Sequence, residues 1–180
     1  DGMSVDDPPR EGFIRGRSFL HPTLRLAFTV PPGFRLFNDS DGVLAVNRDR
    51  ALMLFSCLPT PVAGPLDDWM RNKLKPTPTD IRTLEINGSE AASGARPRGS
   101  DTGLGQARYI AIRQGARVCN FALVSEGADQ DRQIEAMVQA ARTFRTLTSS
   151  EAASLQPYRL RIVSPAGSTP AQLAARMPYP

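Results

Sequence analysis

Short connections between consecutive strands constrain this 180-residue chain more than any other feature of its sequence. The dipeptide Asn87-Gly88, the strongest short hairpin signal, lies between two runs of strand character, Ile81–Ile86 and Ser89–Ala95. A second pair of runs, Gln106–Arg113 and Arg117–Val124, is separated by only three residues. Because parallel neighbours need a crossover of a dozen or more residues, the sequence predicts a mostly antiparallel sheet.

The first half of the chain adds strands to this sheet. Residues Thr23–Val30 place apolar side chains at every second position, which is typical of a half-buried strand. Phe34–Phe37 and Val43–Val46 follow as shorter extended runs. Ala51–Leu58 carries apolar residues on both faces, which favours a central position in the sheet.

Two helices are expected to pack on the sheet. Pro65 stands at the expected first helical position of one helix, and Pro76 ends it. The other helix is expected to be capped by Asp129 or its neighbours, and it presents an apolar stripe at helical spacing. This stripe consists of Ile134, Met137, Val138, Ala141 and Phe144. Helices packed on the faces of a mostly antiparallel sheet define the α+β class.

Beyond residue 147 the sequence predicts three short elements. They are a helical turn capped by Thr148, a strand at Tyr158–Val163 and a helix at Ala171–Met177 capped by Thr169.

Composition excludes several classes of protein. Hydrophobic residues make up 41% of the chain, too many for a disordered protein. The densest apolar stretch, Ala51–Leu58, is far shorter than the roughly 20 residues of a membrane-spanning helix. The net charge of +4 reflects 22 basic against 18 acidic residues, and the arginines are scattered without interleaved aromatic residues. We therefore expect neither a membrane span nor a nucleic-acid partner.

The two cysteines, Cys57 and Cys119, each lie within an apolar run. Neither belongs to a C-x-x-C motif or a Cys/His cluster, which excludes a zinc knuckle. Buried free thiols are the favoured interpretation, and a disulfide between neighbouring strands is the alternative in an oxidising compartment.

The chain has a single histidine, His21, so a two-histidine H-E-x-x-H site cannot be housed in it. A hydrolase that uses His21 with a serine is the enzymatic alternative, and a surface or packing role is the favoured interpretation. We predict no catalytic, cofactor-binding or metal-binding residues in this chain.

None of the acidic and glycine-rich motifs of the sequence predicts a binding site. Asn38–Gly42 resembles a calcium loop, but Arg48 stands where the loop needs its last carboxylate. Two acidic pairs, Asp67/Asp68 and Asp129/Asp131, fall in first helical turns, where the helix dipole explains them. Gly94–Ser100 has P-loop glycine spacing without the lysine, and Gly103–Gly105 lacks the third glycine of a dinucleotide fingerprint.

Two longer stretches resemble a known family. Gly12–Phe34 resembles a segment that follows the catalytic part of bacterial zinc metalloproteases of the HExxH type, relatives of HtpX and the CAAX prenyl proteases. Phe144–Val163 resembles the segment that closes the same C-terminal region. The middle, Leu24–Leu147, resembles a PsbP-like α/β/α sandwich, and Arg159–Met177 resembles the first half of a LysM-like glycan-binding module, with Ser168 in place of its aspartate.

This resemblance implies a division of the chain and a role. Residues 1–20 are expected to be an extended segment from a preceding domain, residues 21–147 the PsbP-like domain, and residues 148–180 a partial LysM-like extension. The chain would be the non-catalytic C-terminal domain of a periplasmic or cell-envelope protease whose zinc site lies upstream of Asp1. Its partners would be its own protease domain and envelope proteins or unfolded substrates. A free-standing PsbP-like ligand- or protein-binding module is the alternative.

Overall fold

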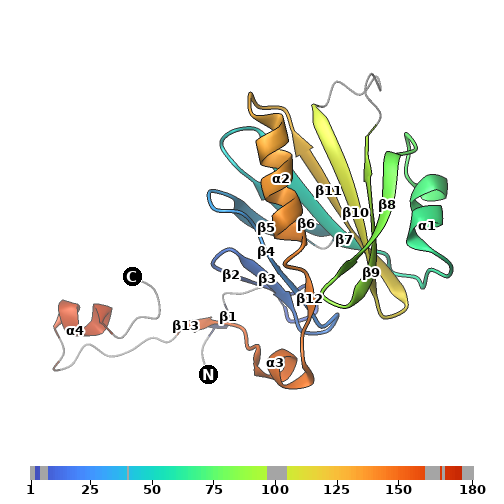
Figure 1. Cartoon of the computed structure of the whole chain (residues 1–180). Coiled ribbons are helices and arrows are strands. Elements are labelled where there is room, and N and C mark those ends of the chain that lie inside the picture. Colours follow the sequence, from blue (N-terminus) through green and yellow to red (C-terminus); the bar gives the residue numbers. More distant parts are fainter. Residues whose placement is uncertain are drawn as a thin grey trace.

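A computed structural model describes residues 3–4, 8–39, 41–96, 105–160, 167 and 169–175 of the chain. Its largest element is a seven-stranded antiparallel sheet in the order β5-β6-β7-β11-β10-β9-β8 (Figure 1). Its strands are β5 (Arg35–Asp39), β6 (Gly42–Val46), β7 (Ala51–Cys57), β8 (Thr79–Ile86), β9 (Ser89–Ala95), β10 (Gln106–Gln114) and β11 (Arg117–Ser125).

A second, four-stranded sheet has the order β12-β4-β3-β2, and β1 (Met3–Ser4) pairs with β13 (Arg159–Leu160). The strands of the second sheet are β2 (Phe13–Arg15), β3 (Ser18–His21), β4 (Leu26–Thr29) and β12 (Arg145–Thr146). The helices are α1 (Leu66–Lys73), α2 (Gln130–Ala141), α3 (Ser149–Ser154) and α4 (Pro170–Ala174). The predicted α+β class with a mostly antiparallel sheet is confirmed. None of the described helices is long and apolar enough to span a membrane.

Both predicted hairpins are present. Asn87 (φ 47°) and Gly88 (φ 80°) form a two-residue turn between β8 and β9, and positive φ at both central positions is what such a turn requires. Gly115 and Ala116 connect β10 to β11, whose pairing runs from Gln106 to Ser125.

The predicted strand at Thr23–Val30 is shorter in the structure. It begins at Leu26, because Arg25 has a positive φ of 53° that a strand cannot continue through. Leu26, Phe28 and Val30 are buried as the alternation predicted.

The amino-terminal segment contains a hairpin where the sequence predicted an extended lead-in. β2 pairs with β3, and β3 pairs in turn with β4. Phe13 and Phe19 are 1% and 2% exposed, and Phe19 belongs to the same core cluster as Phe28 of β4. The origin of residues 1–20 in a preceding domain stays a prediction.

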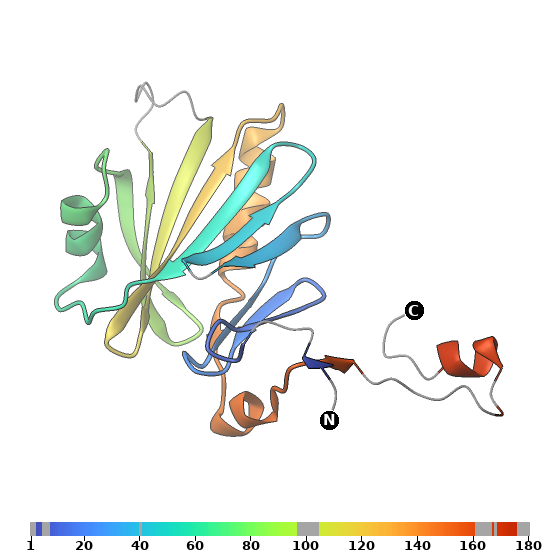
Figure 2. The same ribbon diagram turned by 180° about the vertical axis from the view of Figure 1, so that it is seen from behind.

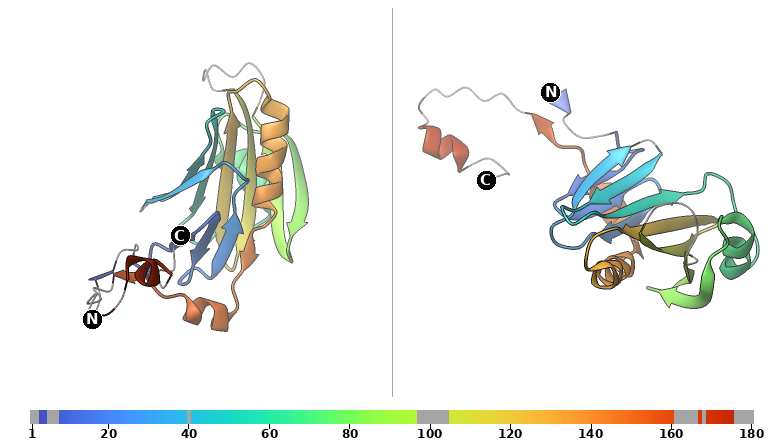
Figure 3. Two further views of the ribbon diagram at one scale, coloured as in Figure 1. Left: turned by 90° about the vertical axis from the view of Figure 1, so that its left-hand side faces the viewer. Right: turned by 90° about the horizontal axis from the view of Figure 1, so that it is seen from above.

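The main core lies between the two sheets and α2. Figure 3 shows α2 running along one face of the seven-stranded sheet. The core centres on a cluster of phenylalanine rings: Phe28 and Phe121 are 5.0 Å apart between ring centroids, and Phe55 lies 4.7 Å from each of them. Phe144, just beyond α2, closes the cluster. The predicted stripe of α2 accounts for this packing, since Ile134, Met137 and Ala141 are all buried on that side.

A second, smaller core lies under α1, at the opposite end of the seven-stranded sheet from β5 (Figure 2). Leu66 and Met70 of α1 pack against Ala92, Ala111 and Val118. Pro65 is the N-cap of this helix and not its first residue, so α1 begins one residue later than predicted. The Leu66 N–H donates to Glu90 Oε1 at 3.0 Å. Asp129 is the N-cap of α2, as expected, but its side chain makes no capping hydrogen bond.

Beyond β12 the chain leaves the main body (Figure 1). Thr148 and Glu151 form a capping box at the start of α3, as the sequence predicted. Residues 161–163 of the predicted strand lie outside the described residues, and only Arg159–Leu160 is assigned as β13. The boundaries at 147 and 148 stay predictions.

Candidate functional site

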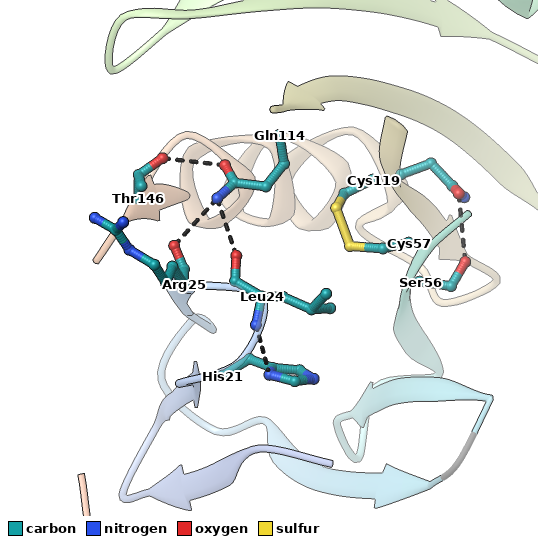
Figure 4. Close-up of a disulfide and its surroundings, with 9 residues drawn as sticks. His21, Leu24, Arg25, Ser56, Cys57, Gln114, Cys119 and Thr146 are labelled. Carbon is teal, nitrogen blue, oxygen red and sulfur yellow. Dashed lines mark hydrogen bonds between the residues drawn. A yellow bond between two sulfur atoms is a disulfide. The ribbon is translucent and has the colours of Figure 1, made fainter. Parts of the chain in front are cut away.

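His21, the one candidate catalytic base, is buried at the end of β3, where it is 8% exposed (Figure 4). Its Nδ1 accepts the backbone N–H of Leu24 at 3.2 Å, so in the neutral ring the proton resides on Nε2. Burial lowers the pKa of the imidazole, and backbone hydrogen bonding at Arg10 and at His21 itself acts in the opposite direction. A ring whose acceptor nitrogen is occupied by the backbone has no free lone pair for activating a serine, so the arrangement fits a packing role.

Cys57 and Cys119 are joined by a disulfide, which corrects the preferred interpretation of free thiols (Figure 4). The two residues are direct cross-strand partners on β7 and β11, with Cα atoms 3.9 Å apart. Sequence reasoning kept this pairing only as an alternative, because strand register was needed to place the two residues opposite each other.

A polar network beside the disulfide joins the two sheets (Figure 4). Gln114, at the end of β10, donates through Nε2 to the carbonyls of Leu24 and Arg25 and accepts from the Thr146 hydroxyl through Oε1 at 3.0 Å. Arg25 in turn donates to the Leu147 carbonyl through Nε and Nη2. Because each group already has a partner, this corner is structural.

The acidic pairs that the sequence singled out are also structural. Asp67 and Asp68 both pair with Arg71 along α1, and the hydrogen bond from Arg71 lowers the pKa of Asp67. Asp131 accepts from Gln106 Nε2 at 2.8 Å. Within the described ranges, no three His, Cys, Asp or Glu side chains gather where they could hold a metal ion, so a zinc ion has no ligand set there. The calcium-loop and glycine motifs include Ser40 and residues 97–104, which lie outside the described part.

A groove with a volume of about 940 Å³ lies between α2 and the strands β8, β9 and β10; we call it the β8–α2 groove. Its floor includes the cross-strand row Ile110, Ser93 and Arg82. Its wall is the face of α2 that carries Ile134, Val138 and Arg142. Sequence reasoning missed this site, because it arises where β8 and β9 extend past the helix.

Arg108 on β10 is the distinctive side chain of the groove. It is half-buried, and its Nη1 donates a hydrogen bond to the Ser93 hydroxyl at 3.0 Å. No carboxylate among the described residues pairs with it. Next to it, the Oε1 atom of Gln106 is buried without a hydrogen-bond donor, while its Nε2 is held by Asp131. A half-buried guanidinium of this kind can bind an anion through two parallel N–H groups.

A second surface lies on the face of the seven-stranded sheet where α1 packs. Phe37, Leu44, Leu54 and Ala122 are successive cross-strand partners on β5, β6, β7 and β11, and we call them the outer apolar row. The row continues to Tyr109, which packs with α1. Farther from α1, Phe37 is 45% and Leu54 48% exposed. These two are the large hydrophobic side chains that are exposed to solvent in the described part of the chain. The exposure of Leu54 qualifies the prediction that β7 is buried on both faces, although its central position is confirmed.

Comparisons with known proteins bear on the fold. No family model and no curated protein matches the chain. The solution structure of cyanobacterial PsbP (CyanoP) from Synechocystis sp. PCC 6803 is similar to this chain with a TM-score of 0.54 and 12% identity, covering 75% of this chain and 98% of that one. A crystal structure from Bacteroides thetaiotaomicron VPI-5482 matches with a TM-score of 0.49 and 14% identity, over 77% of this chain and 51% of that one.

The chain therefore has a PsbP-like α+β fold, as the sequence predicted. An identity of 12% shows the fold alone. The relation to zinc metalloproteases and the partial LysM-like end stay predictions.

Proposed function

We propose that this chain is a non-catalytic module that binds another protein through the outer apolar row. Phe37 and Leu54 carry the proposal, because large apolar side chains exposed in one contiguous row are typical of protein–protein contact sites. The Arg35 guanidinium stacks over the Phe37 ring, 5.5 Å from its centroid, and so adds a polar rim to the row.

We further propose that the partner is the catalytic domain of a zinc metalloprotease, with this chain as its C-terminal accessory domain. The resemblance at Gly12–Phe34 and Phe144–Val163 supports this assignment, and zinc would belong to that domain. The disulfide between Cys57 and Cys119 supports an oxidising compartment, such as the periplasm or cell envelope.

The experiment has two parts. The gene upstream of the Asp1 codon should encode an H-E-x-x-H motif in the same reading frame. The protease domain, expressed separately, should then bind this chain in calorimetry, and the double variant Phe37→Ser/Leu54→Ser should lose that binding while it keeps its fold. Leu155→Ser, which removes an apolar side chain outside the sheet, is the matched control. Undiminished binding by the double variant would reject the row as the contact surface.

A free-standing ligand- or protein-binding module is the second candidate, and the β8–α2 groove favours it. An upstream sequence without the motif, together with a ligand in the groove, would decide for this alternative.

A further inference from the structure

We propose that the β8–α2 groove binds an extended peptide segment that presents a carboxylate to Arg108. This site is separate from the outer apolar row, because it lies on the α2 side of the sheet and the row lies on the α1 side.

Arg108 carries a charge that no carboxylate among the described residues compensates. Arg108 is half-buried, and its hydrogen bond to the Ser93 hydroxyl leaves most of the five guanidinium N–H donors for other acceptors. Removing a cation from water without a counter-ion is unfavourable, and a carboxylate that binds it through two N–H groups offsets that cost.

Neighbouring charges direct the carboxylate towards the sheet side of the groove. Arg82 is the cross-strand neighbour of Ser93, and its present partner is Asp80, an exposed pair that contributes little to stability. Arg82 is therefore available to a ligand. On the helix wall, Asp131 and Glu135 would repel an anion. The anion is thus expected over Ser93, between Arg82 and Arg108.

The shape of the groove favours an extended peptide as the occupant. β8, an eight-residue strand, runs along the groove, so an extended segment can lie over the sheet face parallel to the strands. In an extended peptide, alternate side chains face the same side about 7 Å apart. The row through Ser93 and the row through Ala91 and Leu84 are also two residues apart on the sheet.

A peptide side chain two positions from the carboxylate would therefore meet Leu84, opposite Val138. Both residues are half-buried and pack against the main core, so they offer an apolar contact. The ligand pattern is an acidic residue and, two positions away, an apolar one. A volume of about 940 Å³ accommodates such a segment.

The test uses a fluorescent eight-residue peptide of threonines with one glutamate and, two positions later, one leucine. Fluorescence polarisation with the full chain at low salt should show saturable binding. Arg108→Gln should weaken the affinity by about tenfold or more, and so should a peptide with glutamine in place of glutamate. Combining the two changes should add no further loss, because each removes the same contact.

Arg117→Gln is the matched control, since it removes an exposed arginine of β11 outside the groove and should bind the peptide like the wild type. Circular dichroism reports whether each variant folds. If Arg108→Gln does not fold, Arg82→Glu, at an exposed site, replaces it as the test variant and should also weaken peptide binding. Absence of saturable binding at millimolar peptide, or equal binding by Arg108→Gln, overturns the proposal. Binding of decanoate or of anionic vesicles in place of the peptide would assign the groove to another ligand and overturn it as well.

Discussion

Single side chains in the phenylalanine cluster set much of the stability of this fold. Phe121 is fully buried and contacts Phe28 and Phe55, so Phe121→Ala should lower the free energy of unfolding by about 3–5 kcal/mol. Phe37→Ala, at a ring 45% exposed on the outer apolar row, should cost much less, within about 1 kcal/mol. Denaturant unfolding measures the free energy of unfolding of both variants. Equal losses of this free energy would show that Phe121 is not a core residue.

The single histidine should make stability depend on pH in a narrow range. Because burial lowers the pKa of His21 in the folded state, the unfolded chain binds more protons as the pH falls through the ordinary histidine value of about 6.5. Stability is therefore greatest above that value and decreases below it, until the folded-state pKa is reached.

Urea unfolding between pH 7.5 and 5.5 measures this dependence. His21→Asn retains an acceptor for the Leu24 N–H and does not titrate, so its stability should change less over the range. An unchanged slope in the variant would assign the pH dependence to other groups.

Among the elements, the pair β7–β11 carries the one covalent link of the described chain. Cys57 and Cys119 are 62 residues apart in sequence, so the disulfide restricts the unfolded state and should contribute about 2–4 kcal/mol. A reducing agent should lower the urea midpoint of the wild type by a corresponding amount. The double variant Cys57→Ala/Cys119→Ala should have the lower midpoint from the start and should not respond to the reductant. A wild type whose midpoint is equally insensitive to the reductant would contradict a stabilising disulfide between Cys57 and Cys119.

Helices and hairpins differ in how well local sequence predicted them. The Asn87-Gly88 turn, the capping box of Thr148 and Glu151, and the α2 stripe are determined by residues close together in the chain, and all three are present. α1 begins at Leu66 and not at Pro65, and its first N–H donates to Glu90, a residue of β9 that is distant in the sequence. Local sequence carries no sign of such a partner.

In the whole molecule, the described structure indicates where the compact part ends. β12 pairs with β4, and the Leu147 N–H donates to the Arg25 carbonyl at 2.8 Å, so the chain is held to the main sheets up to this point. α3 has no buried residues. We expect limited proteolysis to cut first between Thr148 and Pro180 and to leave a folded remainder.

A shortened chain that ends at Thr148 tests the same boundary. It loses the contact of Arg15 with the Tyr158 ring and the pair Arg145–Glu151, both at the periphery, so it should unfold cooperatively with a small loss of stability. Failure of this chain to fold would show that residues 149–180 belong to the domain.

Local patterns in the sequence predicted the α+β class, the mostly antiparallel pairing of the strands and much of the core, but not the order of the strands in the two sheets. Periodicity and turn residues act over a few positions, so Leu26, Phe28 and Met137 could be assigned to the interior from spacing alone. Three other features depend on the three-dimensional packing: the disulfide, the burial of His21 and the β8–α2 groove. Cys57 meets Cys119 through strand register, and the surroundings of Arg108 in space leave it without a carboxylate partner among the described residues. Both depend on residues far apart in the chain, whose proximity is fixed by the packing of sheets and helix together.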